Sequence, residues 1–462
     1  TVPIRWAGEP RDGSTLDGQS RFRGWCVPVG SRDTETGVSP YSGNFTSVGV
    51  SNCMDRRMFL TTACAGAASL SGCLSLLPSD RAKTPLPTVP GGSWTQHGAD
   101  NANTFAPDVA APPRGNLAWT SEAFTRWEPA IADGTVYTTN FDPSTDGHAL
   151  ALDAQDGSEL WRTPLDGSGD HGRALVDGRF IVAHGRELVA LDPQDGEVVW
   201  RRSLDRLPTG RRSGYAPELL AADDGSGTVV VPHHGGLKAV RATNGDPRWE
   251  TTVVTRPLLT PAIDDAVYAI GRVDGTDSLA ALALDDGAIR WTTALETPST
   301  SADPVATDHG VLVVEGDALV VYDRETGERR SKIPLFDLDT TLDTTVAADG
   351  RIAFVANHEG LLAVDLEAET TRWLHEDDVY AAGFAVGTET VVAMVDGSAY
   401  VSSDHAETIT AFDRETGDAR WNYVLDGFHA LTIPPILVDG AVCFATSSTN
   451  ALAVLGDVPA ER

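Results

Sequence analysis

The stretch Ala149-Leu-Ala-Leu-Asp-Ala-Gln-Asp-Gly157-Ser-Glu-Leu-Trp161 decides the fold of this chain, because the same phrase recurs along it. An alternating apolar run ends in Asp, a tight turn with Gly follows, and Trp comes four residues later. The phrase returns with the pairs Gly196 and Trp200, Gly245 and Trp249, Gly287 and Trp291, and Gly417 and Trp421. Two copies are degenerate, since Ser331 stands where Trp is expected after Gly327, and Glu369 replaces Gly before Trp373. A period of about 40 residues indicates a repeat architecture.

Each phrase predicts two antiparallel strands joined by a hairpin. Alternating apolar residues suit a strand, and Asp-Gly, Thr-Gly or Asn-Gly supplies the positive φ of the turn. A second turn, mostly of the Asp-Gly type, precedes each phrase at residues 133–134, 177–178, 224–225, 264–265, 309–310, 349–350, 387–388 and 439–440. Each unit therefore predicts four strands, which is one blade of a β-propeller, and the eight turns predict eight blades.

The two ends of the repeat region are predicted to share one blade. Strands that close a blade are expected at residues 161, 200, 249, 291, 331, 373 and 421, but the eighth unit stops after the run at 451–455. Leu117-Ala-Trp119 lies upstream without a blade of its own. We therefore predict an all-β fold, an eight-bladed β-propeller of four-stranded antiparallel blades in which the N-terminal strand around Trp119 completes the C-terminal blade. The alternative, an open β-solenoid, would leave both half-units with an exposed sheet edge.

These repeats resemble those of the PQQ-like, quinoprotein-type eight-bladed propellers. The resemblance covers residues 94–457 and includes the lead-in Trp94-Thr-Gln-His-Gly-Ala-Asp-Asn-Ala-Asn-Thr104. It implies that the repeat tryptophans dock one repeat on another, namely Trp119, Trp161, Trp200, Trp249, Trp291, Trp373 and Trp421. The family holds both PQQ-dependent alcohol dehydrogenases and the non-enzymatic lipoprotein BamB of outer-membrane assembly, so the resemblance leaves the function open.

An export signal is predicted ahead of the repeats. Met54 is the first methionine, and it opens a segment with the twin arginine Arg56-Arg57, a short apolar stretch and Leu70-Ser-Gly-Cys73. Residues 54–73 therefore predict a Tat-type lipoprotein signal peptide with Cys73 as the lipidated residue. The apolar stretch is shorter than the roughly 20 residues of a spanning helix. A plain cleaved signal and an uncleaved anchor are the alternatives.

The flanking segments predict a tethered domain. Residues 1–53 are polar, show no repeat, and are expected to be a non-native, disordered upstream extension; a native disordered extension is the alternative. Residues 74–93 contain four prolines and Gly91-Gly92, which predicts a Pro-rich linker. The protein is thus predicted to be exported and anchored to the outer face of the cytoplasmic membrane.

The charge predicts an unusual habitat. The chain carries 35 basic and 66 acidic residues, a net charge of −31, and its lysines are Lys83, Lys238 and Lys332. Such a surface repels itself at low salt, whereas molar salt shortens the screening length to about 3 Å. The composition therefore predicts a protein of a halophilic organism, specifically an archaeon. The alternative is an ordinary acidic surface. A nucleic-acid partner is not expected, because little would neutralise phosphate.

Enzyme signatures are missing from the sequence. The PQQ alcohol dehydrogenases of the family use an adjacent Cys-Cys pair, and this chain has none. It also lacks the G-x-S-x-G, H-E-x-x-H and Walker patterns. The glycines of 167–172 lead into a strand and not into a helix, so they predict no phosphate-binding loop. His233-His234 has no spaced third ligand, so no metal site is predicted. Cys443 lies in an apolar run and would have no disulfide partner in the monomer once the signal peptide is cleaved and Cys73 is lipidated.

A small ligand, if one binds, is expected at the mouth of the central channel, where the innermost strands begin. The residues there are Trp127, Glu128, His171, Arg173, Tyr215, Glu218, Thr260, Asp303, Thr344, Tyr380 and Ala381. Their mixture of aromatic, acidic and basic side chains suits a polar small molecule, and it equally suits a solvated funnel.

These patterns predict a monomeric, membrane-tethered scaffold that binds a protein partner at the cell envelope and carries no cofactor. One alternative is a PQQ-dependent alcohol or aldose dehydrogenase with calcium-bound PQQ, in which Glu128 or Asp303 would act as base by position alone. The other is a carbohydrate- or cell-surface-binding module.

Overall fold

The computed structural model describes residues 84–460 except 125–126, 141–146, 167–169, 185, 205–220, 224, 234, 256, 258, 300, 336–343, 358–359, 377–378, 397–406, 426–432 and 446–450. These residues belong to one compact unit, 74–462. The predicted upstream extension and signal peptide, including Arg56, Arg57 and Cys73, lie outside the described residues.

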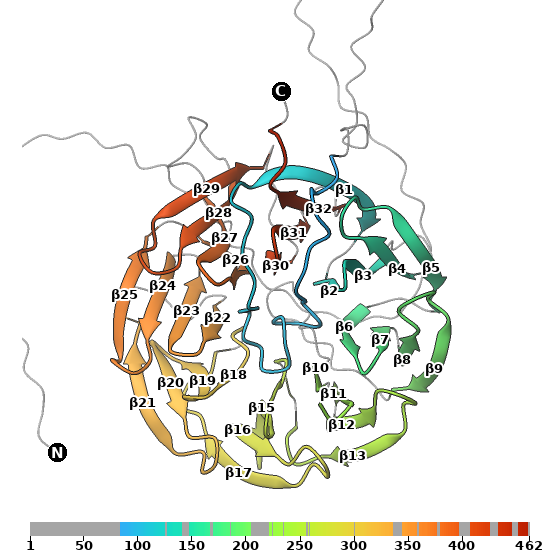
Figure 1. Ribbon diagram of the computed structural model, residues 1–462. Coiled ribbons are helices and arrows are strands. Elements are labelled where there is room, and N and C mark those ends of the chain that lie inside the picture. The colour runs from blue at the N-terminus through green and yellow to red at the C-terminus, as the bar shows by residue number, and fades with distance from the viewer. Residues whose placement is uncertain are drawn as a thin grey trace, which may run out of the picture. The chain divides into compact units, whose positions relative to one another are not determined.

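Eight four-stranded antiparallel sheets stand in a ring around a central channel (Figure 1), and each sheet is one blade. Blades 1 to 4 are β2 (Ala130–Ala132), β3 (Thr135–Asn140), β4 (His148–Asp153) and β5 (Glu159–Pro164); β6 (Asp170–Val176), β7 (Arg179–His184), β8 (Glu187–Leu191) and β9 (Val198–Ser203); β10 (Ala221–Asp223), β11 (Thr228–His233), β12 (Gly236–Arg241) and β13 (Pro247–Thr251); and β14 (Ala262–Ile263), β15 (Val267–Val273), β16 (Thr276–Leu282) and β17 (Ile289–Ala294).

Blades 5 to 8 continue the ring in the same order. They are β18 (Val305–Thr307), β19 (Gly310–Glu315), β20 (Ala318–Tyr322) and β21 (Arg329–Pro334); β22 (Thr345–Asp349), β23 (Ile352–Asn357), β24 (Gly360–Asp365) and β25 (Thr370–His375); β26 (Val379–Val386), β27 (Thr390–Asp396), β28 (Glu407–Asp413) and β29 (Ala419–Val424); and β30 (Ile436–Val438), β31 (Ala441–Ala445), β32 (Ala451–Gly456) and β1 (Asn116–Phe124).

The predicted fold and the predicted ring closure are confirmed. Strand β1 pairs antiparallel with β32, with Asn116 opposite Gly456 and Thr120 opposite Ala453, so that the two ends of the repeat region complete blade 8 together. Figure 1 shows these strands side by side at the point where the chain enters and leaves the ring. This pairing covers the sheet edge that β32 would otherwise expose.

Burial explains why the middle strands are apolar throughout. Strand β20 is buried at every position, because each blade is sandwiched between two neighbouring blades. The outer strand β5 instead buries Trp161 and leaves Glu159, Leu160 and Arg162 exposed. The hydrophobic core therefore lies between the blades, and the outer strands form the rim of the ring.

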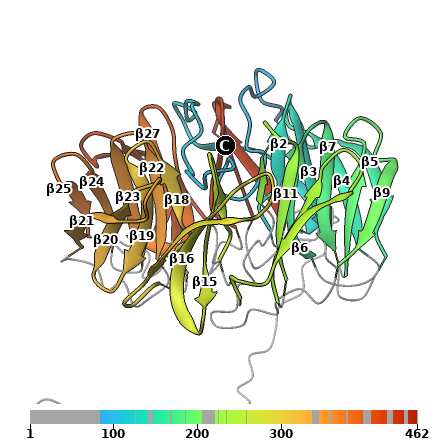
Figure 2. The ribbon, with the colours of Figure 1, turned by 90° about the horizontal axis from the view of Figure 1, so that it is seen from below.

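The two ends of the ring differ. We call the end at which each innermost strand turns into the second strand the turn face, and the opposite end, where the innermost strands begin, the loop face. Figure 2 shows the ring from the side, with the blue segment that precedes β1 lying at one end of it. The backbone bridge between Trp94 and Ile131, near the end of β2, assigns this segment to the turn face.

The repeat tryptophans connect successive blades. Each indole N–H donates to a backbone carbonyl of the next blade or of the segment that precedes β1. The donor and acceptor pairs are Trp119 to Ala154 (3.2 Å), Trp161 to Pro193 (3.0 Å), Trp200 to Ala242 (2.8 Å), Trp249 to Leu284 (2.9 Å), Trp291 to Arg324 (2.8 Å), Trp373 to Arg414 (2.9 Å) and Trp421 to Pro112 (2.8 Å).

A β-bulge lies next to the tryptophan in the outer strand. In blade 1, Ala151 is opposite Trp161 and Leu152 is opposite Glu159, so Leu160 has no partner in the ladder. The same shift precedes Trp200 in blade 2. A bulge increases the local twist of the strand. It also explains why Leu160 and Val199 are exposed to 54% and 43% although both are apolar.

The geometry of the turn, which repeats from blade to blade, explains why the turn contains glycine. Gly157 has φ of +71°, and a Cβ there would lie 2.5 Å from Cε3 of Trp119. Gly287 faces Trp249 in the same way, at 2.6 Å. The glycine is required both for its backbone conformation and because the indole of the preceding blade lies against it.

The two degenerate repeats meet at the same junction, the one between blades 5 and 6. Ser331 occupies the tryptophan position of blade 5, whose neighbour is blade 6, and blade 6 is the blade that carries Glu369 in the turn. Glu369 keeps the positive φ, at +55°. Because blade 5 presents no indole, the turn of blade 6 tolerates a side chain where the other turns require glycine.

This junction predicts a favourable coupling between two substitutions. Ser331→Trp alone should lower the free energy of unfolding, because Glu369 occupies the space against which the indole would pack. With Glu369→Gly added, the indole should dock, and a double-mutant cycle in urea should give a coupling of about 1–3 kcal/mol. Glu369→Gly alone should change stability by less than about 1 kcal/mol. Strict additivity of the two changes would contradict the pairing.

Candidate functional site: the central channel

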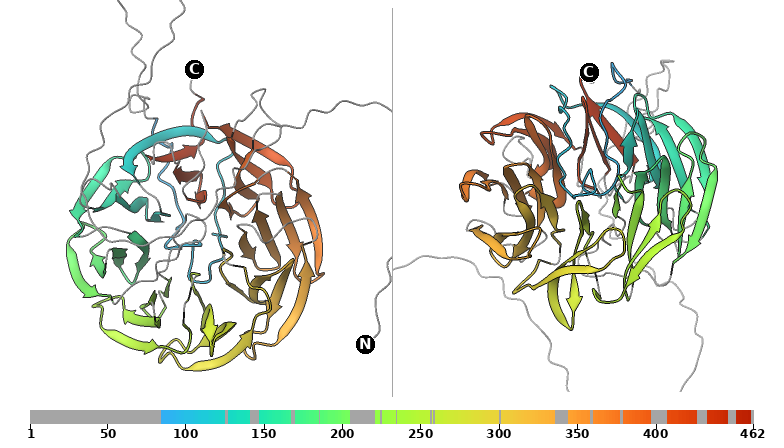
Figure 3. Two further views of the ribbon diagram at one scale, coloured as in Figure 1. Left: turned by 180° about the vertical axis from the view of Figure 1, so that it is seen from behind. Right: turned by 60° about the horizontal axis from the view of Figure 1, so that its bottom comes forward.

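Residues 91–110, which we call the channel segment, cross the turn face and contact every blade. Figures 1 and 3 show this part of the chain passing over the centre of the ring. At least one bond joins it to each innermost strand or to the turn after it: Ile131 N to Trp94 O (2.7 Å), Leu175 N to Thr95 O (2.7 Å), Ala222 N to Gln96 Oε1 (2.6 Å), Ile263 N to Asn101 O (2.5 Å), Ala306 N to Ala102 O (3.0 Å), Ala348 N to Thr104 O (2.9 Å), Val386 N to Phe105 O (2.8 Å) and Asp439 N to Gly91 O (2.9 Å).

These bonds have a simple physical cause. The innermost strand of each blade is a sheet edge that faces the channel, and its backbone N–H groups need acceptors. The channel segment supplies those acceptors for all eight blades from one stretch of chain. It therefore closes the turn face by pairing with edges that would otherwise face the channel.

At the centre of the channel segment, His97 bridges two carboxylates. Its Nδ1 lies 2.7 Å from Oε1 of Glu128, and its Nε2 lies 2.7 Å from Oδ2 of Asp303. Glu128 precedes β2 in blade 1, and Asp303 precedes β18 in blade 5. Since these blades are four places apart in a ring of eight, His97 joins opposite sides of the channel.

The remaining carboxylate oxygens are also bonded. Oε2 of Glu128 accepts from Nε1 of Trp94 at 3.0 Å and from the backbone N–H of Gly98 at 3.3 Å. Oδ1 of Asp303 accepts from the backbone N–H of Thr260 at 2.7 Å. Each oxygen of both carboxylates therefore has a donor from the protein itself.

The electrostatics favour a charged His97. Burial of the imidazole opposes its charge, but the carboxylates of Glu128 and Asp303 outweigh burial and raise the pKa of His97 well above its usual value. Near neutral pH the ring is thus an imidazolium, in which both nitrogens are donors. This state matches the two short contacts to carboxylate oxygens.

Two further polar side chains tie the centre together. Arg173 of β6 is fully buried, and it donates to the backbone carbonyl of Glu128 and to Oγ1 of Thr139, both at 2.7 Å. Asn103 of the channel segment donates through Nδ2 to the carbonyls of Thr260 and Pro304, each at 3.1 Å. These bonds connect blade 1 with blade 2, and blade 4 with blade 5.

The structure brings together several of the predicted channel residues. Glu128, Arg173, Thr260 and Asp303 gather around the channel segment, and Trp127 adjoins Glu128. Thr344 is buried and its N–H donates to Oγ of Ser301 in blade 5. His171 lies on β6, and Tyr380 and Ala381 lie on β26, but their side chains are outside the described part of the structure. Tyr215 and Glu218 lie outside the described residues altogether.

The sequence analysis missed His97 as a site residue. Its only signal was its place in the lead-in from Trp94 to Thr104, which carries no strand periodicity. Its carboxylate partners lie 31 and 206 residues away along the chain.

Calcium-bound PQQ does not fit this arrangement. Calcium takes six to eight oxygen ligands, yet the carboxylates of Glu128 and Asp303 are already engaged by His97, Trp94 and two backbone N–H groups. Within the described ranges, no group of three or more His, Cys, Asp or Glu side chains is placed to hold a metal. The same carboxylates cannot act as a base while they are bonded to His97.

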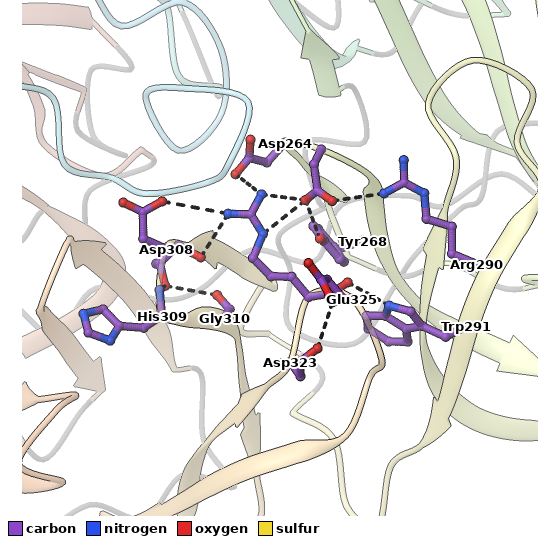
Figure 4. A network of polar contacts seen from close by, with 12 residues as sticks. Asp264, Tyr268, Arg290, Trp291, Asp308, His309, Gly310, Asp323 and Glu325 are labelled. Atoms are coloured by element: carbon purple, nitrogen blue, oxygen red, sulfur yellow. Dashed lines mark hydrogen bonds and ion pairs between the residues drawn. The ribbon is translucent and has the colours of Figure 1, made fainter.

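Arginine networks reinforce two blade junctions at the turn face. One of them is centred on Arg324. Figure 4 shows Asp264, Tyr268, Asp308 and Arg290 of this network. Arg324 contacts Asp264 at 2.6 Å and Asp265 at 2.5 Å. Burial favours protonation of Asp265, but bonds from Arg324 and Tyr268 outweigh it and lower its pKa. Arg414 pairs with Asp349 in the same way between blades 6 and 7. These ion pairs connect neighbouring blades and stabilise the ring.

Helices long and apolar enough to cross a membrane do not occur in the described part of the chain.

Comparison with solved structures supports the fold. The chain matches a quinohemoprotein alcohol dehydrogenase of Pseudomonas putida with a TM-score of 0.56 and 14% identity, covering 80% of this chain and 81% of that one. It matches a quinohemoprotein alcohol dehydrogenase of Comamonas testosteroni with a TM-score of 0.55 and 14% identity, covering 80% and 82%. At this level of identity the likeness concerns the propeller architecture.

Sequence comparison identifies the family. The outer membrane protein assembly factor BamB of Yersinia pestis is 25% identical over 230 residues, which are 47% of this chain and 55% of that protein. The chain thus spans about half the length of this relative. The family model described as outer membrane protein assembly factor BamB matches residues 108–276 and 275–461, which together cover the blades. The chain therefore belongs to this BamB-like family of PQQ-like β-propellers.

Proposed function

We propose that this protein is a binding and assembly scaffold, exported and tethered to the outer face of the cytoplasmic membrane through Cys73, and that it recruits protein partners of the cell envelope. The family supports a role of this kind, since the relative from Yersinia pestis is an assembly factor by name. The twin arginine Arg56-Arg57 and the Leu-Ser-Gly-Cys sequence support the export and the lipid anchor.

One observation carries the choice of a scaffold over a dehydrogenase. The two channel carboxylates that a dehydrogenase would need as base or calcium ligands are bonded to the protein's own His97. A rigid ring whose centre is filled by its own chain offers its outer surfaces for binding. Because the channel segment covers the centre of the turn face, we assign the partner to the loop face.

Site-specific photo-crosslinking in the native membrane tests this assignment. Asp274, in the exposed turn between β15 and β16, lies at the loop face, and Asp308, between β18 and β19, lies at the turn face of the next blade. A photoreactive residue at Asp274 should give one discrete protein adduct, and the matched probe at Asp308 should give none. Equal labelling from both positions would contradict a partner at the loop face.

A parallel assay separates the enzymatic alternative. The purified full chain in molar KCl, supplied with PQQ and calcium, should not oxidise alcohols or aldoses with an artificial electron acceptor. Turnover that saturates with PQQ would overturn the scaffold proposal. Retention on a glycan column without turnover would favour the surface-binding module instead.

A further inference from the structure

We propose that the channel segment, residues 91–110, is a latch that closes the turn face of the channel, and that the proton shared by His97 with Glu128 and Asp303 holds it shut. This inference goes beyond the scaffold function and does not depend on it. It concerns how the centre of the ring opens.

The geometry makes His97 the central fastening of the segment. The other bonds between the channel segment and the blades use mainly neutral backbone groups, with at least one bond to each blade. Among the described residues, His97 forms the ion pairs of this segment, and its two partners belong to opposite blades. Charge-assisted hydrogen bonds are roughly twice as strong as neutral ones. Loss of the charge on one ring therefore weakens the attachment on both sides at once.

If His97 loses its proton, the site cannot keep both of its short contacts as hydrogen bonds. A neutral imidazole has a single N–H, so one of the two 2.7 Å contacts would place a nitrogen lone pair against a carboxylate oxygen. Asp303 would keep one donor, the backbone N–H of Thr260, and Glu128 would keep Trp94 and Gly98. The nitrogen lone pair and the carboxylate oxygen would then repel each other in a largely buried place, which is costly.

The two carboxylates that contact His97 act in the same direction and favour its charge. Glu128 and Asp303 face it from blades 1 and 5, and Phe105 of the channel segment packs edge-on at 5.1 Å without adding charge. Arg173 reaches the backbone carbonyl of Glu128 from β6. Asp100 lies three residues along the segment, where it bonds to Thr104 and Ala102. The nearest formal charges are thus negative and favour the imidazolium.

The sign of the pH dependence follows from this balance. Because the pKa of His97 is raised in the folded protein, its contribution to closure is complete below its unfolded value of about 6.5 and is lost as pH rises through the folded value. The latch is therefore held most firmly below about pH 6.5 and opens as the pH rises from there through the folded value.

Opening would expose a defined surface. The N–H groups of Ile263, Ala306, Ala348 and Val386, on four adjacent blades, donate to carbonyl groups within residues 101–105 of the channel segment. Release of the segment would expose these strand edges at the turn face and would free the two carboxylates, which precede β2 and β18, toward the channel.

Hydrogen exchange measured by mass spectrometry on the full chain in molar KCl tests the latch. Between pH 7 and pH 10.5, after correction for the intrinsic exchange rate, protection of peptides within 91–110 should fall by up to about tenfold for each unit of pH until the raised pKa of His97 is reached, and should stay constant above it. Peptides from β7, β20 and β28 should keep their protection, which shows that the blades stay folded. Unchanged protection of 91–110 throughout this range would overturn the proposal.

Two variants and a control separate the latch from general stability. His97→Gln should expose 91–110 at every pH and abolish the pH step, whereas His309→Gln, in the turn between β18 and β19, should behave like the unmodified protein. If His97→Gln does not fold, Asp303→Asn serves the same purpose, because it removes one of the two charges and should move the step to lower pH. A step that persists unshifted in either variant would show that another group controls the segment.

Discussion

Replacing Trp119 with Ala should lower the free energy of unfolding by about 3–5 kcal/mol, the range of large-to-small substitutions in protein cores. The indole is 1% exposed and packs against the turn of blade 1. Its Nε1 donates to the carbonyl of Ala154 at 3.2 Å. Trp119 also lies on β1, the strand that closes the ring, so its loss weakens the docking between blades 8 and 1 at the point of closure.

Urea denaturation at a fixed KCl concentration, followed by far-ultraviolet circular dichroism, measures this loss. Trp119→Phe is the matched variant, because it keeps an aromatic ring but removes the N–H, and it should cost less than Trp119→Ala. Trp161→Ala removes an equivalent indole from a junction away from the closure. A change of under 1 kcal/mol for Trp119→Ala would mean that the closing strand does not limit stability.

Gly157→Ala should destabilise the protein by about 2–4 kcal/mol, from about 1 kcal/mol of backbone cost at positive φ and 1–3 kcal/mol of overpacking. The backbone at Gly157 has φ of +71°, and the added Cβ would lie 2.5 Å from Cε3 of Trp119. Neither the indole nor the turn can retreat easily, because both are held by hydrogen bonds across the junction.

A second glycine separates the two costs. Gly178 has a similar φ of +63°, but a Cβ there would have no neighbour within 4 Å. Gly178→Ala should therefore show the backbone cost alone, about 1 kcal/mol. In the Trp119→Ala background, Gly157→Ala should cost no more than Gly178→Ala does. Equal costs for both glycines in the unmodified protein would contradict docking of the indole on the turn.

The blades could be predicted because each depends on local signals. The Asp-Gly turns, the alternating apolar strands and the spacing from Gly157 to Trp161 lie within one repeat, and propeller blades are built from such short hairpins. Closure by the strand around Trp119 could also be predicted, since one half-unit at each end of the region lacked a partner. The tryptophan docking followed from the family resemblance.

The junction between blades 5 and 6 shows what signals within one repeat could not predict. Ser331 and Glu369 read as two separate defects in the repeat, because they belong to different copies of the phrase. They form one altered junction only once the order of the blades places the tryptophan position of blade 5 against the turn of blade 6. The constraint acts between repeats, and no single repeat contains it.

The sequence by itself determined the number of blades, the four strands of each and the strand that closes the ring. The tertiary structure decided what occupies the channel. It places His97 between Glu128 and Asp303, which lie on opposite blades, and leads residues 91–110 past the edge of every innermost strand. The physical reason is that strand periodicity and turn chemistry act over a few residues, whereas the contacts at the centre of a ring exist only after the ring has closed.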